Sequence, residues 1–267
     1  MAAAATRRLT RRMRTILALL MATLSATLFA ILLIRQASAP NISKAFPAGE
    51  IVVGVDASFP PFALDDGTSL RGLDIDIATA IAAELGVPIR FENIGFYALY
   101  DALISGRVDV LISALRIDRA RMDDVRYTQP YFDNGLLIVT PAQAAETDID
   151  SLANARLAFE YASSADAQVR LWQEEGRAIK RLPYERPAYA LDALQLGQAD
   201  AAIVDAATLR LYQREQRDWN IEFEYITSDP YAIAARIDRR DAWKLVDRAL
   251  SALKERGEIA IIIDAWL

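Results

Sequence analysis

Residues 101–112 read DALISGRVDVLI, and residues 192–203 read DALQLGQADAAI. Asp, Ala, Leu, Gly, Asp and Ile recur at the same spacing in the two segments. Each segment has the pattern of a helix end, a glycine break and a short apolar strand. Any helix–glycine–strand unit shares some of this pattern, but two copies in one chain also suggest two similar α/β lobes.

A strand–helix–strand unit precedes the first copy. The apolar run IVVGV at residues 51–55 predicts a buried strand, and Asp74 resembles the N-cap of a helix that stops at Gly86. Pro88 prevents the helix from resuming, and Ile89 begins the next strand candidate. This order predicts parallel sheets flanked by helices, which is an α/β fold.

Two further apolar runs, at residues 135–139 and 231–235, are candidates for the two crossings between the lobes. With these crossings, the first lobe comprises residues 50–135 and 232–267, and the second lobe comprises residues 136–231. The first lobe is therefore discontinuous in sequence, and the second is an insertion.

The N-terminus has the pattern of an export element. Residues 1–39 contain six arginines and no acid, an uncharged run at 15–34, and the small residues ASA at 37–39. This order predicts a secretory signal peptide, but about 20 apolar residues can also span a bilayer as an uncleaved anchor. Both alternatives place the remainder on the periplasmic or extracellular face. Residues 40–49 (PNISKAFPAG) read as a linker.

The composition excludes several classes of function. The formal net charge is −6, and outside residues 1–39 it falls to −12, because 24 of the 30 basic residues remain against all 36 acidic ones. An acidic body argues against a nucleic-acid partner. The chain has no cysteine and no histidine, so disulfides, thiolate chemistry and histidine-ligated metals are excluded. We therefore expect no metal, no cofactor and no catalytic residue.

Charged, hydroxyl and aromatic side chains follow four of the strand candidates. Ligands of open parallel sheets bind beyond the carboxyl ends of the strands. A free amino acid needs a guanidinium for its carboxylate, an acid for its ammonium and an apolar slot for its side chain. The sequence offers all three at these strand ends.

Four motifs carry a resemblance to a known family: GVDASFPPF (54–62), GLDID (72–76), SALRIDRAR (113–121) and YTQPYF (127–132). In this order they resemble the extracellular solute-binding proteins of family 3, which serve polar amino-acid ABC transporters. The resemblance covers about residues 48–267. It implies a two-lobed periplasmic-binding-protein-like fold with two hinge strands, an amino-acid-like ligand and an inner-membrane ABC permease as partner. We expect a monomer.

The resemblance also implies roles for individual residues. Arg121 falls where the family binds the ligand α-carboxylate, and Asp205 where it binds the α-ammonium. Aromatic residues that enclose the ligand are matched by Phe59 and Phe96. An acid near the ligand side chain is matched by Asp56. The remaining contacts of the pattern are matched by Ser113, Ala114, Ser163 and Ser164.

Three positions depart from the family pattern. Arg116 stands where Thr or Ser is usual, Asp118 where Thr is common, and Ala162 where Gly is usual. Arg116 could contact an acidic ligand, block the carboxylate seat, or pair with Asp118 or Asp56. Asp56 favours a cationic or amide ligand instead, so the ligand class is open at this point, and Arg116 is kept as a candidate contact.

Each candidate ligand contact could instead have a structural role. Asp205, Ser163 and Ser164 could cap helices, Arg121 could lie on a solvated charged face, and the two phenylalanines could be core residues. Two other functions stay open: a membrane-tethered sensory module, and an enzyme resembling cyclohexadienyl dehydratase. The enzyme would need an acid in the cleft, for which Glu160 and Asp56 are candidates.

Overall fold

The computed structural model describes Met21 and residues 41–142, 154–216 and 219–267. The chain divides into two units, residues 1–41 and 42–267, and the second contains the whole of the fold considered below. Apart from Met21, the expected signal peptide or anchor at residues 1–39 lies outside the described residues. Within the described part, no helix combines the length and the apolar character needed to cross a membrane.

The first of two five-stranded sheets has the order β5-β1-β6-β15-β7. Its first three strands are parallel, and β15 joins β6 and β7 in antiparallel pairs. The strands are β1 (Ile51–Val55), β5 (Ile89–Asn93), β6 (Val110–Leu111), β7 (Val125–Tyr127) and β15 (Ala234–Arg236). The helices of this lobe are α2 (Ile42–Ala45), α3 (Leu73–Leu85), η1 (Phe96–Ala98), α4 (Leu99–Ile104), η2 (Arg119–Arg121), α8 (Arg240–Glu255) and α9 (Glu258–Trp266). A small sheet of β2 (Ser58–Phe59), β3 (Ala63–Asp65) and β4 (Leu70–Arg71) lies between β1 and α3 in sequence.

The second sheet has the order β11-β10-β12-β9-β13. Its parallel strands are β10 (Arg156–Glu160), β11 (Lys180–Tyr184) and β12 (Ala201–Asp205), and β9 (Leu136–Pro141) and β13 (Ile221–Tyr225) are antiparallel to their neighbours. The helices of this lobe are α5 (Ser164–Glu174), α6 (Pro187–Gln195) and α7 (Ala206–Glu215). The order of elements therefore confirms the predicted two-lobed α/β fold.

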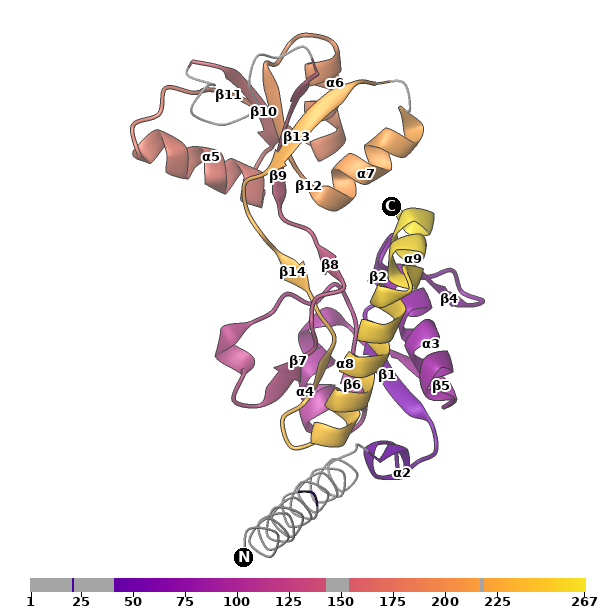
Figure 1. The fold of residues 1–267 in the computed structure, drawn as a ribbon. Helices are drawn as coiled ribbons and strands as arrows, with labels where there is room; N and C mark the ends of the chain where they lie inside the picture. Colours follow the sequence, from indigo (N-terminus) through magenta and orange to yellow (C-terminus); the bar gives the residue numbers. More distant parts are fainter. Residues whose placement is uncertain (1–20, 22–40, 143–153, 217–218) are drawn as a thin grey trace, which may run out of the picture. The chain divides into compact units, whose positions relative to one another are not determined.

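Two short strands, β8 (Phe132–Asp133) and β14 (Pro230–Tyr231), connect the sheets and pair with each other (Figure 1). The runs at 135–139 and 231–235 were predicted as the crossings, and that prediction is wrong by a few residues. The first run becomes β9, an inner strand of the second sheet, and the second run leads into β15 of the first sheet. A continuous apolar run suits an inner strand that is buried on both faces, which a crossing strand is not.

The repeated segments have the same local structure in both lobes. Gly106 and Gly197 have φ values of 78° and 68°, a left-handed conformation that glycine adopts without steric cost. Asp109 accepts the backbone N–H of Val52 at 3.0 Å, and Asp200 accepts that of Arg156 at 2.8 Å. Each repeated aspartate thus fastens the start of its own strand to the neighbouring parallel strand, β1 or β10.

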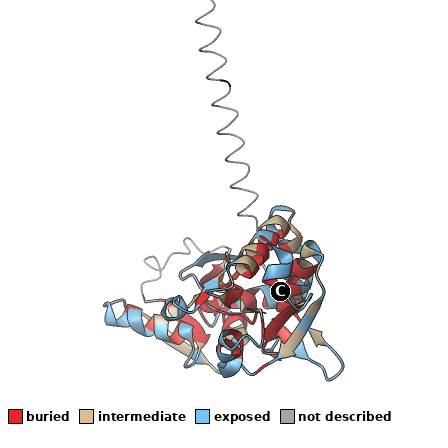
Figure 2. Ribbon diagram, turned by 90° about the horizontal axis from the view of Figure 1, so that it is seen from below, coloured by how far each residue is buried: buried red, intermediate tan, exposed pale blue. Residues whose placement is uncertain are grey.

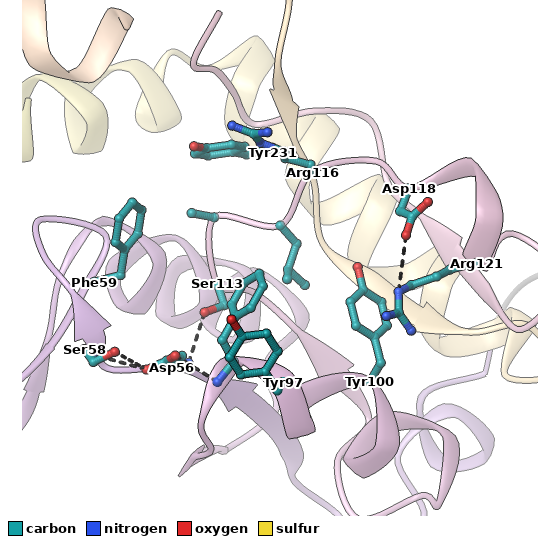
Figure 3. Close-up of a pocket in the computed structure, with 13 residues that line it drawn as sticks. Asp56, Ser58, Phe59, Tyr97, Tyr100, Ser113, Arg116, Asp118, Arg121 and Tyr231 are labelled. Atoms are coloured by element: carbon teal, nitrogen blue, oxygen red, sulfur yellow. Dashed lines mark hydrogen bonds and ion pairs between the residues drawn. The ribbon is translucent and has the colours of Figure 1, made fainter. Parts of the chain in front are cut away.

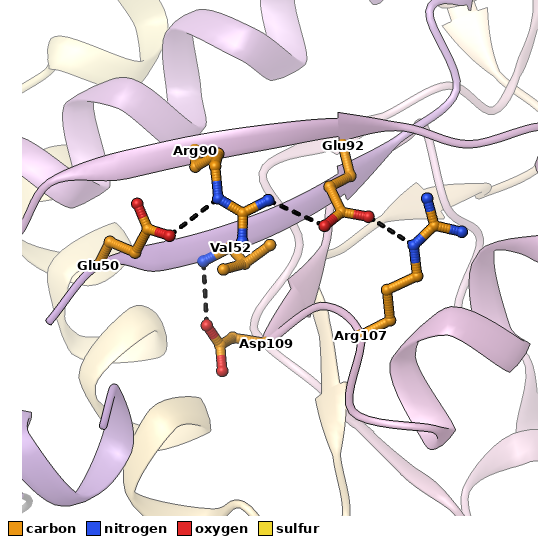
Figure 4. Close-up of polar contacts among 6 residues, drawn as sticks. All are labelled: Glu50, Val52, Arg90, Glu92, Arg107 and Asp109. Carbon is orange, nitrogen blue, oxygen red and sulfur yellow. Dashed lines mark hydrogen bonds and ion pairs between the residues drawn. The ribbon is translucent and has the colours of Figure 1, made fainter. Parts of the chain in front are cut away.

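Exposed ion pairs surround this contact in the first lobe (Figure 4). Arg90 bridges Glu50 at 2.8 Å and Glu92 at 2.9 Å, and Arg107 contacts Glu92 at 2.6 Å. Arg90 and Glu92 belong to β5, an edge strand of the sheet. Exposed pairs contribute little to stability, but charged side chains on an edge strand disfavour pairing with another chain.

Buried residues concentrate in the strands and on the inner faces of the helices (Figure 2). Helix α8 buries Val246, Leu250 and Leu253, which recur at helical spacing. Trp243 of the same helix is only partly buried, and its Nε1 donates to Tyr127 O at 2.9 Å. The packed strands hold their carboxyl ends in fixed positions, and the candidate site lies there.

Candidate ligand-binding site

A cavity of about 730 Å³ opens beyond the carboxyl ends of β1 and β6 (Figure 3). Seven of the residues predicted from the sequence line it: Asp56, Phe59, Phe96, Ser113, Ala114, Arg116 and Arg121. Ser163, Ser164 and Asp205 do not line this cavity; they lie at strand ends of the second sheet. Six further residues line the cavity without having been predicted as contacts from the sequence: Ser58, Tyr97, Tyr100, Leu115, Asp118 and Tyr231.

Asp56 directly follows β1, and its carboxylate organises one side of the cavity. Oδ1 accepts the backbone N–H of Ser58 at 3.0 Å and its hydroxyl at 2.7 Å. Oδ2 accepts the backbone N–H of Phe96 at 2.9 Å. Ser113 lies behind it, because its hydroxyl accepts the N–H of Asp56 at 3.0 Å. Asp56 therefore holds two segments of the cavity wall in position.

Aromatic side chains supply the apolar surface of the cavity. Phe59 is 52% exposed and stacks on the buried Phe62 with ring centroids 5.5 Å apart. Phe96 is 49% exposed, and its neighbour Tyr97 is 99% exposed. Exposed aromatic rings gathered at one concave surface are typical of a ligand site rather than of a core. The alternative of core residues therefore does not fit Phe59 and Phe96.

Arg121 ends the short helix η2 on the far side of the cavity. Its guanidinium carbon lies 4.0 Å from the centroid of the Tyr100 ring, and its Nε lies 3.3 Å from Asp118 Oδ2. The hydroxyl of Tyr100 is 2.8 Å from that of Tyr127, which fixes the ring under the guanidinium. A guanidinium that stacks on an aromatic ring keeps its planar fork available for a carboxylate.

Arg116 pairs with neither of the acids considered from the sequence. Its Nε lies 2.8 Å from Asp229 Oδ2, beside the crossing strand β14, and its backbone forms a bridge with Tyr231. Burial raises the pKa of Asp229, and the positive charge of Arg116 opposes this rise. Arg116 therefore faces the cavity with its charge already balanced, which weakens the argument for an acidic ligand.

Asp74 is not the N-cap of α3, contrary to the prediction. The helix begins at Leu73 after Gly72, so Asp74 lies in the first turn with its side chain completely buried. There it accepts the N–H of Ala114 at 2.7 Å, and burial raises its pKa to about 7. Ala114 has a φ of 46°, an unfavourable conformation for a residue with a side chain. The buried carboxylate therefore stabilises a strained turn in the cavity wall.

The second lobe repeats this arrangement. Ala162 has a φ of 58°, and its N–H donates to Oδ2 of the buried Asp166 at 3.0 Å. Glycine, which the family resemblance implies at this position, adopts such a left-handed conformation without steric cost. Asp166 differs from Asp74 because it also pairs with Arg181 and with Arg170.

The predicted residues of the second lobe cap two helices. Ser163 is the N-cap of α5, and its hydroxyl also donates to Glu160 O at 2.6 Å. Ser164 is the first residue of α5 and is exposed. Asp205 is the N-cap of α7, and its Oδ1 accepts the N–H of Thr208 at 2.8 Å. A capping role for Ser163 and Asp205 is thus present, and it leaves Asp205 Oδ2 without a hydrogen bond from any described residue.

Sequence reasoning overlooked Tyr100 and Tyr231 because neither stands in a motif; each comes to the cavity through a pairing remote in sequence. Tyr97 had a usable signal, since it directly follows Phe96. Among the residues described, no group of three or more acidic side chains is arranged to hold a metal ion.

Two α/β lobes joined by two strands, with polar and aromatic groups beyond the strand ends, define a two-lobed solute-binding protein. Residues 51–267 match the family described as bacterial extracellular solute-binding proteins, family 3. The chain belongs to this family.

Relatives and solved structures agree with this assignment. The chain is 26% identical over 228 residues to ABC transporter arginine-binding protein 1 of Escherichia coli, covering 83% of this chain and 92% of that protein. It is 25% identical to the ABC transporter glutamine-binding protein GlnH of Bacillus subtilis, with 82% and 81% covered. The open, unliganded L-cystine solute receptor of Neisseria gonorrhoeae shares the fold, with a TM-score of 0.73, 18% identity and 84% and 95% covered. The chain therefore binds a small solute outside the cytoplasm for delivery to an ABC transporter, and it is not an enzyme.

Proposed function

We propose that the solute is a free amino acid, held by its α-carboxylate at Arg121. This proposal rests on the position of Arg121, whose guanidinium stacks on the ring of Tyr100 at the cavity. Its ion pair with Asp118 engages Nε, and no described residue accepts a hydrogen bond from either Nη atom. A ligand carboxylate can therefore form the paired hydrogen bonds that a guanidinium prefers.

The second lobe supplies the groups for the α-ammonium. Asp205 keeps Oδ2 available after its cap hydrogen bond, and it stands at the carboxyl end of β12. Ser163 and Ser164 lie at the neighbouring strand end. Phe59 and Phe96 provide apolar walls on the first lobe, and Ser113 and Ala114 also line the cavity. These groups match the three requirements of an amino acid.

The relatives support an amino-acid ligand, because their names specify arginine, glutamine and cystine. We propose an inner-membrane ABC permease as the partner and a monomeric chain, either released or held by residues 1–39. N-terminal sequencing of the exported protein distinguishes release from anchoring, and mass measurement in solution tests the monomer.

The test is calorimetric titration of the exported protein with the proteinogenic amino acids. Arg121→Ala removes the partner of a buried ligand charge, and we expect it to weaken binding by about 2–5 kcal/mol. Arg119→Ala is the matched control, because Arg119 lies on the same short helix but does not line the cavity. Asp205→Asn keeps an acceptor for the cap and removes the charge, so it should weaken binding without unfolding α7.

Two results would refute this proposal. The first is an absence of binding by every amino acid in the panel. The second is an affinity of Arg121→Ala equal to that of Arg119→Ala, which would place the ligand carboxylate elsewhere.

A further inference from the structure

Glu160 is an acidic residue at a strand end of the second sheet, and the proposed site does not use it. It is the last residue of β10, next to β12, which ends at Asp205. The register of this parallel pair sets Phe159 beside Ile203, so both carboxylates belong to the same end of the sheet. Asp205 also pairs with Leu136, the first residue of β9, and β9 follows the crossing strand β8 after two residues, so this end of the sheet adjoins the crossings.

The Glu160 carboxylate has no partner of its own. Its backbone oxygen accepts the hydroxyl of Ser163, but no hydrogen bond or ion pair reaches its side chain from any residue that the structure describes. The residue is partly buried, and burial, followed by the nearby charge of Asp205, raises its pKa. Two acids therefore stand at the same end of this sheet, and neither forms an ion pair with a described residue.

Glu160 does not line the cavity of the first lobe, and the charged side chains that do line that cavity are already engaged. Arg116 is paired with Asp229, and Arg121 with Asp118. Asp56 accepts three hydrogen bonds from Ser58 and Phe96. The charge of Glu160 is thus less compensated than that of Asp56, although Asp56 is the acid that the family resemblance assigns to the ligand side chain.

The proposed position of the ligand adds an energetic argument about the unpaired charge of Glu160. An amino acid held as proposed uses Arg121 for its carboxylate and Asp205 for its ammonium. A neutral or acidic side chain would leave Glu160 further desolvated and unpaired, which is costly. A cationic side chain would remove that cost by pairing with it.

We infer that Glu160 is a specificity-determining residue that receives the side chain of the ligand, and that the chain selects amino acids with a guanidinium or ammonium side chain. This inference rests on the proposed function, because it assumes that Arg121 and Asp205 hold the α-groups.

The test compares L-arginine, L-lysine and L-citrulline by calorimetric titration of the exported protein and of Glu160→Gln. Citrulline has the length of arginine without its charge. We expect the wild-type protein to bind arginine or lysine at least tenfold more tightly than citrulline, and Glu160→Gln to lose roughly tenfold of that preference. Citrulline affinity should change by less than about threefold.

Glu174→Gln is the matched control, because Glu174 is an exposed acid at the far end of α5 and should leave the affinities for arginine, lysine and citrulline unchanged. The inference is overturned if the wild-type protein binds citrulline as tightly as arginine and lysine. It is also overturned if Glu160→Gln weakens arginine and citrulline equally. Failure of the proposed function gives a different result, namely no binding of any amino acid or full affinity in Arg121→Ala.

Discussion

The hydroxyl of Tyr131 donates a 2.7 Å hydrogen bond to Oδ1 of Asp74, and both side chains are completely buried or nearly so. Oδ2 of the same carboxylate accepts the N–H of Ala114 in the cavity wall. Tyr131 directly precedes the crossing strand β8, and its own N–H donates to Tyr231 O at 2.9 Å. One buried carboxylate therefore connects the ligand cavity to both crossing strands.

The free energy of unfolding should depend on pH through Asp74. Burial raises its pKa to about 7, whereas an unfolded aspartate titrates near 3.9. The folded state therefore binds the extra proton between these values, so this contribution is complete below about pH 4 and is lost as the pH rises to about 7. We expect Asp74→Asn, which cannot titrate, to show a flatter profile. Urea denaturation of both proteins at several pH values between 4 and 7 measures the difference.

Subtracting the two profiles cancels the contributions of other titrating groups. Asp76→Asn serves as a control, because Asp76 lies on the exposed side of the same helical turn. Parallel profiles for wild type and Asp74→Asn would show that Asp74 is ionised throughout this range.

Tyr131→Phe should destabilise the protein by removing one of the two donors to Asp74. An unsatisfied buried acceptor costs about 1–3 kcal/mol. In the double variant with Asp74→Asn, the cost of Tyr131→Phe should differ by at least about 0.5 kcal/mol, because contacting residues are not additive. Thermal and urea unfolding give both numbers. Tyr225→Phe, at an exposed tyrosine, should have little effect, and strict additivity of the pair would contradict the contact.

The two lobes could be predicted from the sequence because the repeated segment is defined by residues that are close to one another in the chain. The glycine, the turn and the strand of each copy depend on interactions between residues that are close in sequence. The pattern can therefore be recognised from the amino-acid sequence. Asp109 and Asp200 recur for a physical reason that only the structure reveals, since each binds the N–H of a strand far away in sequence. The equal spacing of the two aspartates could be recognised in the sequence, but their hydrogen-bond partners could not.

The partners of the charged residues in and around the cavity could not be predicted in the same way. Arg116 meets Asp229 across a separation of more than a hundred residues, and Asp74 meets Ala114 across forty. Asp74 was read as an N-cap because its position before an apolar run fits one, but Gly72 takes that position. Ser163 and Asp205 show the opposite case: their capping role is local, and the sequence could indicate it.

Ala162→Gly should increase the free energy of unfolding. Ala162 has a φ of 58°, and a left-handed residue with a side chain costs roughly 1–2 kcal/mol relative to an ordinary conformation. Glycine removes this strain but gains entropy in the unfolded chain, so we expect a net gain of about 0.5–1 kcal/mol. Ala167→Gly, at an exposed position of α5, should instead destabilise by about 1 kcal/mol. If urea denaturation gave both variants a lower free energy of unfolding than wild type, the backbone at Ala162 would not be strained.

Binding of a cationic amino acid should release protons if Glu160 receives its side chain. Burial and the charge of Asp205 raise the pKa of Glu160, so part of the population is protonated somewhat above the ordinary glutamate value of about 4.3. A cation beside the carboxylate favours its ionised form, so binding expels the proton and affinity rises with pH through this range. The binding enthalpy of arginine, measured near pH 5 in two buffers of different ionisation enthalpy, should therefore differ in wild type and much less in Glu160→Gln. An equal buffer dependence in the two proteins would mean that the released proton comes from another group, and that the ligand cation does not lie beside Glu160.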